Sequence, residues 1–356
     1  MSARGFTSDN AASVHPDVLA ALARADGGHA ISYGHDPLTE RVHAALEREF
    51  GAGATAVLVF NGSAANVLCL RAACRPWEAA ICGVGSHLNV DEGGAPEAVA
   101  GVKLLTVATP DGKLTPELVA PRIERIGDEH AVQPRVLSVT QSSELGTVYS
   151  PAELRALAEF AHDRDLLLHV DGARLANAAA ALDCSLGEAA AGADLLSLGG
   201  TKNGLLLGEA VIVRARAAEL GATLPYLRKQ TLQLASKMRY IAAQFDAYLD
   251  GELWRRTASH ANAMAARLGA AVAGIGGVEV TQAVQANAVF ARIPRRAVAP
   301  LQERFPFHVW APGEGAEGAI HDEVRWMCAW DTTEDDVDAF AAAIGEVLAG
   351  APAAAR

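Results

Sequence analysis

Continuous apolar runs alternate along much of this 356-residue chain with segments whose apolar residues recur at helical spacing. Residues 136–140, 166–170 and 195–198 are apolar runs, and residues 151–164 carry a helical stripe. Further strands are expected over residues 56–60 and 209–213, and further helices over residues 38–50 and 63–73. Apolar runs this continuous suit strands covered on both faces, and strands separated by helices indicate a mostly parallel sheet with right-handed crossovers. The alternation therefore predicts an α/β fold.

From about residue 226 onward the regular alternation of expected strands and helices ends. Long helices are expected first, followed by short strands and a closing helix, and this mixture is typical of a smaller α+β domain. The expected helices cover residues 232–249, 254–273 and 333–348, and the expected strands cover residues 277–280, 288–291 and 324–328. We expect residues 311–318 to form a flexible connector and residues 350–356 to fray.

Composition excludes several classes of protein. The net charge of −12 at pH 7 disfavours a nucleic acid or an anionic membrane as the partner. No apolar stretch is long enough to span a bilayer, and the first residues lack an apolar signal region. These features predict a soluble, cytoplasmic protein. The five cysteines are odd in number and include no CxxC pair, so neither a disulfide framework nor a metal site is expected.

Two polar residues each follow an expected buried strand. Asp171 ends the run Leu166-Leu-Leu-His-Val-Asp171, and Lys202 lies just past the run that starts at Leu195. Parallel sheets bind ligands at the carboxyl ends of their strands, where both side chains would lie. A lysine can form a Schiff base with pyridoxal phosphate, and an aspartate can hold its pyridine nitrogen protonated. The pair therefore predicts pyridoxal phosphate as cofactor.

A glycine-containing turn supplies a candidate phosphate site. In Asn61-Gly-Ser-Ala-Ala-Asn66, which follows an expected strand and opens a helix, Gly62 permits close approach of the backbone and Ser63 adds a hydroxyl donor. An ordinary strand-to-helix turn capped by serine has the same pattern. Neither a P-loop nor a GxGxxG fingerprint is present, so a nucleotide is not implied.

Other polar residues are candidate site residues only if they lie near Lys202 and Asp171. His87, in a segment rich in turn-forming residues, can stack on a flat ring or move a proton, although a lone histidine is more often a surface or capping residue. Arg174 and Arg325 carry the planar fork that suits a carboxylate, and Ser8 can add a hydroxyl. Each of these three can also be exposed or ion-paired.

Taken in order, these segments resemble the low-specificity L-threonine aldolases, which are pyridoxal-phosphate enzymes of the aspartate aminotransferase-like fold type I. The matching stretches run from the N-terminus nearly to the C-terminus: Ser8-Asp-Asn10, Tyr33-Gly-His-Asp36, Phe60-Asn-Gly-Ser-Ala-Ala-Asn66, Ser86-His87, Gly94-Ala-Pro96, Gly112-Lys-Leu-Thr-Pro116, Glu144-Leu-Gly-Thr-Val-Tyr149, His169-Val-Asp-Gly-Ala-Arg174, Gly199-Gly-Thr-Lys-Asn-Gly204, Leu234-Ala-Ser-Lys-Met-Arg239 and Val324-Arg-Trp-Met-Cys-Ala-Trp-Asp331. Each stretch alone is weak evidence, but a shared ordered set of this length is highly specific.

The resemblance implies a role for each cofactor residue. Lys202 would form the Schiff base, Asp171 would pair with the pyridinium nitrogen, and His87 would stack on the ring. Gly62 and Ser63 would hold the phosphate. The fold would be a seven-stranded, mostly parallel large domain over residues 36–250 and a small α+β domain over residues 251–356, with residues 1–35 contributing to the active site.

The resemblance also implies substrate and subunit contacts. Ser8, Arg174 and Arg325 would grip the substrate carboxylate, and Arg174 is counted with the cofactor residues as well. Lys229 would reach the phosphate of a neighbouring subunit, because family members are homo-oligomers with shared active sites. A tetramer built as a dimer of dimers is expected.

Two departures from the family pattern bear on the substrate hydroxyl. One branch of the family has a histidine near that hydroxyl, whereas the matching stretch here, Thr140-Gln-Ser-Ser-Glu144, has none. His35 stands where many relatives carry an acid, and we include it among the substrate residues. The general base stays open between His87, an acid such as Asp91, and a water.

The expected reaction is reversible retro-aldol cleavage of L-threonine, L-allo-threonine and analogues such as phenylserine to glycine and an aldehyde. An aminotransferase or a β-eliminating lyase of the same fold is an alternative enzyme. A non-enzymatic regulator module is another alternative, although such regulators carry a DNA-binding domain ahead of the fold and none is expected before Ser8. A D-threonine aldolase is disfavoured, because that family resembles a metal-dependent barrel with its lysine near the N-terminus.

Overall fold

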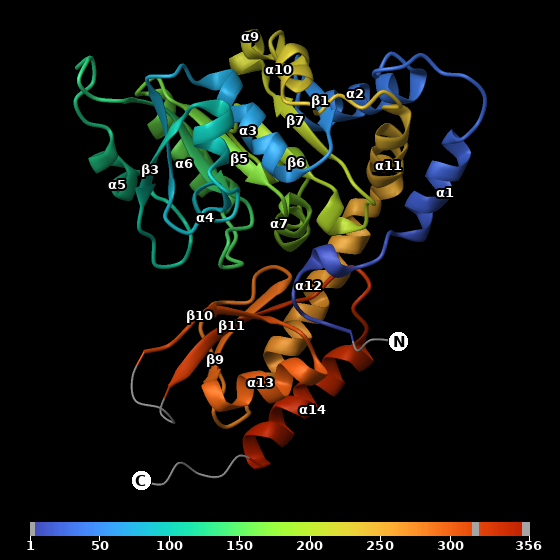
Figure 1. Cartoon of the computed structure of the whole chain (residues 1–356), viewed down its shortest axis with the longest axis vertical. Helices are drawn as coiled ribbons and strands as arrows, with labels where there is room; N and C mark the ends of the chain where they lie inside the picture. The colour runs from blue at the N-terminus through green and yellow to red at the C-terminus, as the bar shows by residue number, and fades with distance from the viewer. Residues whose placement is uncertain (1–3, 315–319, 351–356) are drawn as a thin grey trace. The chain divides into compact units, whose positions relative to one another are not determined.

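The computed structural model describes residues 4–314 and 320–350 (Figure 1). Contacts divide the chain into two compact units. The larger unit holds Val14–Glu144 and Val148–Arg255, and the smaller unit holds Met1–Ser13, Leu145–Thr147 and Arg256–Arg356. Parts of the expected connector over residues 311–318 and of the expected tail over residues 350–356 lie outside the described residues. The division at residues 35 and 250 stays a prediction.

The larger unit is built on a seven-stranded sheet in the order β1-β7-β6-β5-β4-β2-β3. Its strands are β1 (Thr55–Val59), β2 (Glu78–Gly83), β3 (Lys103–Val107), β4 (Gln133–Thr140), β5 (Leu167–Gly172), β6 (Leu195–Gly199) and β7 (Glu209–Val213). Only β7 runs antiparallel to its neighbours, β1 and β6, while the other adjacent strands are parallel. The expected α/β fold with a mostly parallel sheet is therefore confirmed.

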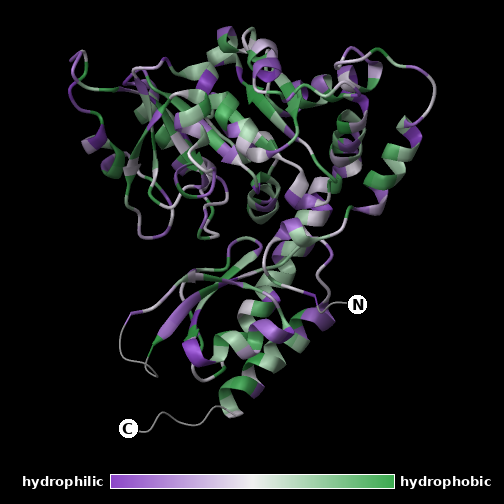
Figure 2. Cartoon of the chain, viewed as in Figure 1, coloured by the Kyte–Doolittle hydropathy of each residue, from purple (hydrophilic) through white to green (hydrophobic). Residues whose placement is uncertain are grey.

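Both faces of this sheet are covered, as the continuous apolar runs require. In β1, Val57 and Val59 join the core under α3, whereas Leu58 points to the opposite face and is also fully buried. Helix α3 contacts β6 and β7, helix α6 contacts β5, and helix α2 contacts β1. Figure 2 shows apolar residues concentrated in the strands of this sheet.

Helix boundaries in the larger unit follow local capping rules. Asp36 caps α2, because its carboxylate accepts hydrogen bonds from the backbone N–H groups of Leu38 (3.1 Å) and Thr39 (2.9 Å). Ser150 and Glu153 form a reciprocal capping box at the start of α6. The longer helices are α1 (Pro16–Ala25), α2 (Pro37–Phe50), α3 (Gly62–Ala73), α6 (Pro151–His162), α7 (Leu175–Leu182), α10 (Leu224–Gln230) and α11 (Arg239–Leu249), and the short ones are α4 (His87–Val90), α5 (Pro116–Val119), α8 (Leu186–Ala189) and α9 (Ala218–Gly221).

The expected helix over residues 232–249 is wrong in its first two turns. Helix α11 begins at Arg239, and Leu232 has a left-handed backbone with φ of 64°. The preceding segment uses its polar groups for long-range contacts instead. Gln233 accepts a hydrogen bond from the Phe60 N–H (3.1 Å), and the Ser236 carbonyl accepts one from the Tyr33 N–H (3.0 Å). A helix that started at Leu232 would be incompatible with these two contacts of Gln233 and Ser236.

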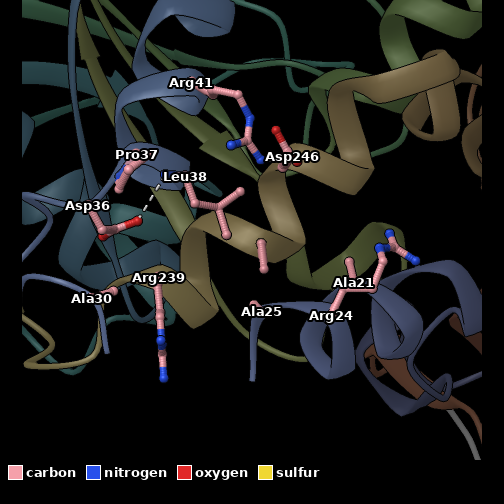
Figure 3. A pocket seen from close by; sticks show the side chains of 11 residues that line it. Ala21, Arg24, Ala25, Ala30, Asp36, Pro37, Leu38, Arg41, Arg239 and Asp246 are labelled. Carbon is pink, nitrogen blue, oxygen red and sulfur yellow. Dashed lines mark hydrogen bonds and ion pairs between the residues drawn. The ribbon is translucent and has the colours of Figure 1, made fainter. Parts of the chain in front are cut away.

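A cavity of about 290 Å³ lies between α1, α2 and α11 (Figure 3). Two arginines of its lining are engaged, one with an acid and one with the backbone. Arg41 pairs with Asp246 at 3.1 Å, and Arg239 donates to the carbonyls of Gly27 (3.2 Å) and Gly28 (3.3 Å). The cavity therefore belongs to the packing of these helices.

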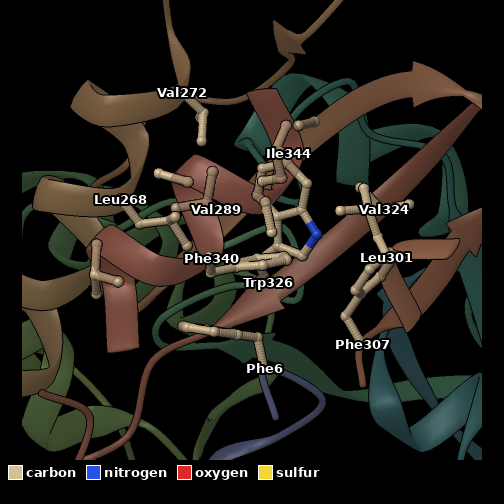
Figure 4. Packing of buried hydrophobic residues seen from close by; sticks show 14 of the residues in the cluster. Phe6, Leu268, Val272, Val289, Leu301, Phe307, Val324, Trp326, Phe340 and Ile344 are labelled. Carbon is tan, nitrogen blue, oxygen red and sulfur yellow. The ribbon is translucent and has the colours of Figure 1, made fainter. Parts of the chain in front are cut away.

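The smaller unit contains an antiparallel sheet in the order β10-β11-β9-β8. Its strands are β8 (Glu279–Val280), β9 (Ala288–Pro294), β10 (His308–Ala311) and β11 (His321–Met327), and its helices are α13 (Arg295–Arg304), α14 (Glu334–Gly350) and most of α12 (Leu253–Val272). Phe6, Trp326 and Phe340 meet in the core, where the Phe6 and Phe340 rings stack 4.5 Å apart (Figure 4). Phe6 of the N-terminal segment is therefore part of this core. The expected α+β composition of the smaller unit is confirmed.

In the described part of the chain, no helix combines the length and apolarity that crossing a bilayer requires.

Candidate active site

Asp171 lies at the carboxyl end of β5, where it is 4% exposed. Its Oδ2 accepts a hydrogen bond from Asn66 Nδ2 (2.8 Å), and its Oδ1 accepts one from the Ala173 N–H (3.0 Å). Asn66 lies on α3 and in turn accepts a hydrogen bond from Ser197 on β6 (2.8 Å). Three neighbouring elements therefore hold this buried carboxylate in one orientation.

Lys202 lies in the short 3₁₀ turn Thr201–Asn203 that follows β6. The approach to this turn is tightly packed, since a Cβ on Gly199 would lie 2.5 Å from the carbonyl oxygen of Ala173. Tyr248 donates to the Gly199 carbonyl (3.2 Å), and Asn203 donates to the Tyr248 hydroxyl (3.2 Å). The turn that presents the lysine is thus fixed from both ends.

His87 begins the short helix α4 and belongs to the same cluster. Its Nδ1 pairs with Glu92 Oε1 at 3.0 Å, and this hydrogen bond is the main reason that the pKa of His87 is raised. The charge of Asp171 raises the pKa further, while the charge of Lys202 lowers it. Asp171 and Lys202 therefore both act electrostatically on His87, and the roles of the three residues stay predictions.

Glu92 and Asn66 connect this cluster and were missed in the sequence. The Glu92 side chain is fully buried, and its Oε1 accepts from both His87 and Asn66 Nδ2 (2.8 Å). Asn66 therefore donates one amide hydrogen to Glu92 and one to Asp171. A signal was present, because Asn66 is a polar residue inside an otherwise apolar helix and needs buried partners.

Glu144 ends the stretch in which one branch of relatives has a histidine. Its carboxylate accepts hydrogen bonds from the His87 backbone N–H (3.1 Å) and the Thr140 hydroxyl (2.6 Å). Burial raises the pKa of Glu144. This stretch therefore supplies a buried acid that holds the backbone of His87.

The turn expected at residues 61–66 forms between β1 and α3, and its role as a phosphate site stays a prediction. Asn61 is the helix cap, since its side chain accepts a hydrogen bond from the Ala64 N–H (2.9 Å), so serine was the wrong capping residue, while an ordinary strand-to-helix turn stays an alternative. Gly62 and Ser63 occupy the first turn, where peptide N–H groups have no acceptor within the helix. A Cβ on Gly62 would meet no atom within 4 Å, so space for an anion remains in front of the turn.

The remaining candidates lie in three places. Arg174 immediately precedes α7 and follows the Asp171 segment. Lys229, on α10, places its ammonium 5.6 Å from the Tyr33 ring, close in sequence to the exposed His35. In the smaller unit, Arg325 on β11 donates to the carbonyl of Thr7 (3.2 Å) beside Ser8. The smaller unit thus brings Ser8 and Arg325 near each other.

Known proteins resemble this chain in sequence and fold. A family model described as beta-eliminating lyase matches residues 5–294. The chain is 40% identical over 347 residues to the low-specificity L-threonine aldolase of Pseudomonas aeruginosa, covering 96% of this chain and 97% of that protein. A protein of the same name from another Pseudomonas strain is 39% identical with the same coverage. The solved threonine aldolase of Leishmania major has a TM-score of 0.89 and 27% identity, covering 97% of this chain and 99% of that one.

The fold and these similarities define a pyridoxal-phosphate-dependent lyase of fold type I. The site fits that cofactor, since a buried carboxylate, a strand-end lysine and an open helix N-terminus meet the needs of its ring nitrogen, aldehyde and phosphate. The chain belongs to the beta-eliminating lyase family and, within it, to the low-specificity L-threonine aldolases. The expected family and cofactor are therefore confirmed.

The buried His169 should make the stability of the protein depend on pH. It is fully buried on β5, its Nδ1 pairs with Ser138 at 2.9 Å, and burial lowers its pKa to about 4. The stability that depends on neutral His169 is present above its ordinary pKa of 6.5 and is lost as pH falls through about 4. From pH 8 to pH 5 the unfolding free energy of the wild type should fall. In His169→Asn this fall should be smaller by about 2 kcal/mol.

Urea unfolding at pH 8, 6.5 and 5 measures this difference. The cavity left by asparagine lowers stability at every pH, so the comparison is between the slopes and not between the absolute values. Exposed His29→Asn is the matched control and should leave the slope unchanged. Equal slopes for the wild type and His169→Asn would contradict the assignment.

Proposed function

We propose that this protein cleaves the Cα–Cβ bond of L-threonine, L-allo-threonine and related β-hydroxy-α-amino acids such as phenylserine, giving glycine and an aldehyde. The reaction is reversible. The observation that carries the proposal is 40% identity, over 96% of the chain, to a low-specificity L-threonine aldolase. Lys202, Asp171 and His87, gathered at the carboxyl edge of the sheet, support it.

Lys202 and Asp171 are assigned to the cofactor. Pyridoxal phosphate, when bound, supplies a sink for the electron pair left by the broken bond. The amine of Lys202 would hold the aldehyde of the cofactor covalently. Asp171 keeps the ring nitrogen protonated, and its two hydrogen bonds to Asn66 and Ala173 keep the carboxylate in place. Gly62 and Ser63 hold the phosphate.

His87 is assigned to the proton of the substrate hydroxyl. Because Glu92 takes the hydrogen on Nδ1, the neutral ring keeps Nε2 as its acceptor. His87 would remove the hydroxyl proton directly or through a water, and its ring would stack on the cofactor. Loss of that proton releases the aldehyde, and protonation at Cα completes glycine.

Ser8, Arg174 and Arg325 are assigned to the substrate carboxylate, with His35 nearer the hydroxyl and Arg174 also serving the cofactor. The closeness of Arg325 to the Thr7–Ser8 peptide supports a shared role for the two residues. Residues 1–35 contribute to the active site in this proposal.

The oligomer proposed is a tetramer, a dimer of dimers with shared sites in which Lys229 reaches the phosphate of a neighbouring subunit. The exposed apolar side chains of Ile31, Tyr226 and Leu232, which are 71%, 74% and 84% exposed, support a subunit contact in this region. A cytoplasmic location stays a prediction.

A panel of β-hydroxy-α-amino acids tests the function. We expect aldehyde release from L-threonine, L-allo-threonine and phenylserine, each far above the rate of Lys202→Ala. An aminotransferase would instead need an added α-keto acid and leave the cofactor in its amine form. No aldehyde from any member of the panel would overturn the proposal.

A further inference from the structure

Glu209 is a buried carboxylate beside the lysine turn that the sequence pattern left unused. It opens β7, lies opposite Gly199 of β6 and Val59 of β1, and is 6% exposed. The other residues of β7 are all apolar and fully buried. Burying a carboxylate among such strands costs several kcal/mol unless hydrogen bonds and opposite charge compensate.

The partners of Glu209 come from three successive residues that lead to the lysine. Its Oε2 accepts a hydrogen bond from the Gly200 N–H (2.7 Å). Its carboxylate also accepts hydrogen bonds from the backbone N–H and the hydroxyl of Thr201. The third partner is the positive charge of Lys202, which acts on Glu209 electrostatically. One carboxylate therefore engages the whole start of the turn.

A neutral side chain could perform the anchoring alone. The amide oxygen of a glutamine accepts the same backbone N–H groups, and the turn is held in addition by Tyr248 and Asn203. The feature that only an acid supplies is its negative charge. The ionisable groups that face it are Lys202 in the turn and Tyr248 on α11, whose pKa is raised by burial and, to a smaller extent, by Glu209.

We propose that Glu209 is a positioning residue for Lys202, which fixes the lysine turn through Gly200 and Thr201 and whose negative charge favours the protonated form of the Lys202 nitrogen. This inference rests on the proposed role of Lys202 as the residue joined to the cofactor. Whenever Lys202 is a free amine, the negative charge of Glu209 would favour the protonated form of its nitrogen.

Titration of Glu209 itself falls in the range where the enzyme would work. Burial raises the pKa of Glu209 to about 7, against the opposing effects of its hydrogen bonds and of Lys202. Its charge is therefore present above neutral pH and lost below it. The electrostatic support for the lysine thus changes across neutral pH.

The test is the pH midpoint of the visible absorption band of the holoenzyme, recorded without substrate. This band reports protonation of the Lys202 nitrogen, which the charge of Glu209 favours. Glu209→Gln should lower the midpoint by about one pH unit, which is a tenfold change in proton affinity. Glu209→Asp, which keeps the charge, should stay near the wild type. Exposed Glu219→Gln is the matched control and should not move the midpoint.

An unchanged midpoint in Glu209→Gln would overturn the proposal, because a purely structural acceptor predicts that result. If Glu209→Gln does not fold, Thr201→Val provides a second test: it removes a donor to the carboxylate, so Glu209 carries less charge at neutral pH and the midpoint should fall. No shift there would equally overturn the proposal. Both measurements omit substrate, so their failure leaves aldehyde release intact and is distinct from failure of the proposed function.

Discussion

Lys202→Ala is expected to abolish aldehyde release and to remove the visible absorption band of the bound cofactor. Lys202 is assigned the covalent attachment of the cofactor, and its amine is also a proton carrier within the site. Loss of general acid–base catalysis alone lowers rates by about 10²–10⁴-fold, so kcat should fall by at least about 10³-fold. Steady-state aldehyde release and an absorption spectrum of the purified protein check the two parts separately.

Exposed Lys103→Ala is the matched control, since it removes the same side chain from β3. It should keep both the band and the activity. A visible band that persists in Lys202→Ala, and that borohydride removes while fixing the cofactor on another lysine, would contradict the assignment of Lys202.

Asp171→Asn is expected to keep the visible band and to lose most of the activity. The lysine is untouched, so the cofactor stays joined to the protein. The ring nitrogen, however, loses its anionic partner at a site that is 4% exposed, where little water can take over the stabilisation. Removing one such preorganised electrostatic partner costs about 10²–10³-fold in kcat. Single-turnover kinetics followed in the visible range measure the chemical step.

Asp163→Asn on the surface is the control for this substitution and should behave as the wild type. Asparagine matches the shape of aspartate, so the hydrogen bonds to Ala173 and Asn66 can be rearranged without a cavity. Full activity in Asp171→Asn would show that another group serves the ring nitrogen.

The central strands of the large sheet were predictable because they are apolar on both faces. Strands β4, β5 and β6 contain the runs at residues 136–140, 166–170 and 195–198. Strands β2 and β3 were not identified. Strand β3 begins with the exposed Lys103 and only its last residue, Val107, is buried, so its pattern is that of an edge strand. Strand β2 was missed although Ala79, Ala80, Ile81 and Cys82 are fully buried, because two of these four residues are alanine, which has little strand preference.

Long-range contacts explain the element that was wrong. Residues 232–238 carry a helical pattern, yet Gln233 and Ser236 bind the backbone of Phe60 and Tyr33, which lie far away in the sequence. No window of neighbouring residues contains that information. The placement of Phe6 in the core of the smaller unit is non-local in the same way.

The cluster of Lys202, Asp171 and His87 was predictable because strand ends and a family pattern mark those residues. Their roles stay predictions, and the structure adds that the charges of Asp171 and Lys202 act on His87. The supporting acids Glu92 and Glu209 could not be found by pattern. Each is a single acid, and its role depends on the buried hydrogen-bond donors that the fold places around it.

The balance of products tests the central claim most directly. Holoenzyme is incubated with L-allo-threonine, and glycine, acetaldehyde, ammonia and α-keto acid are quantified in the same sample. Cleavage of the Cα–Cβ bond predicts one glycine for each acetaldehyde, with no ammonia or keto acid above the Lys202→Ala background. Ammonia and keto acid formed in equal amounts without glycine would contradict the account and identify β-elimination as the reaction.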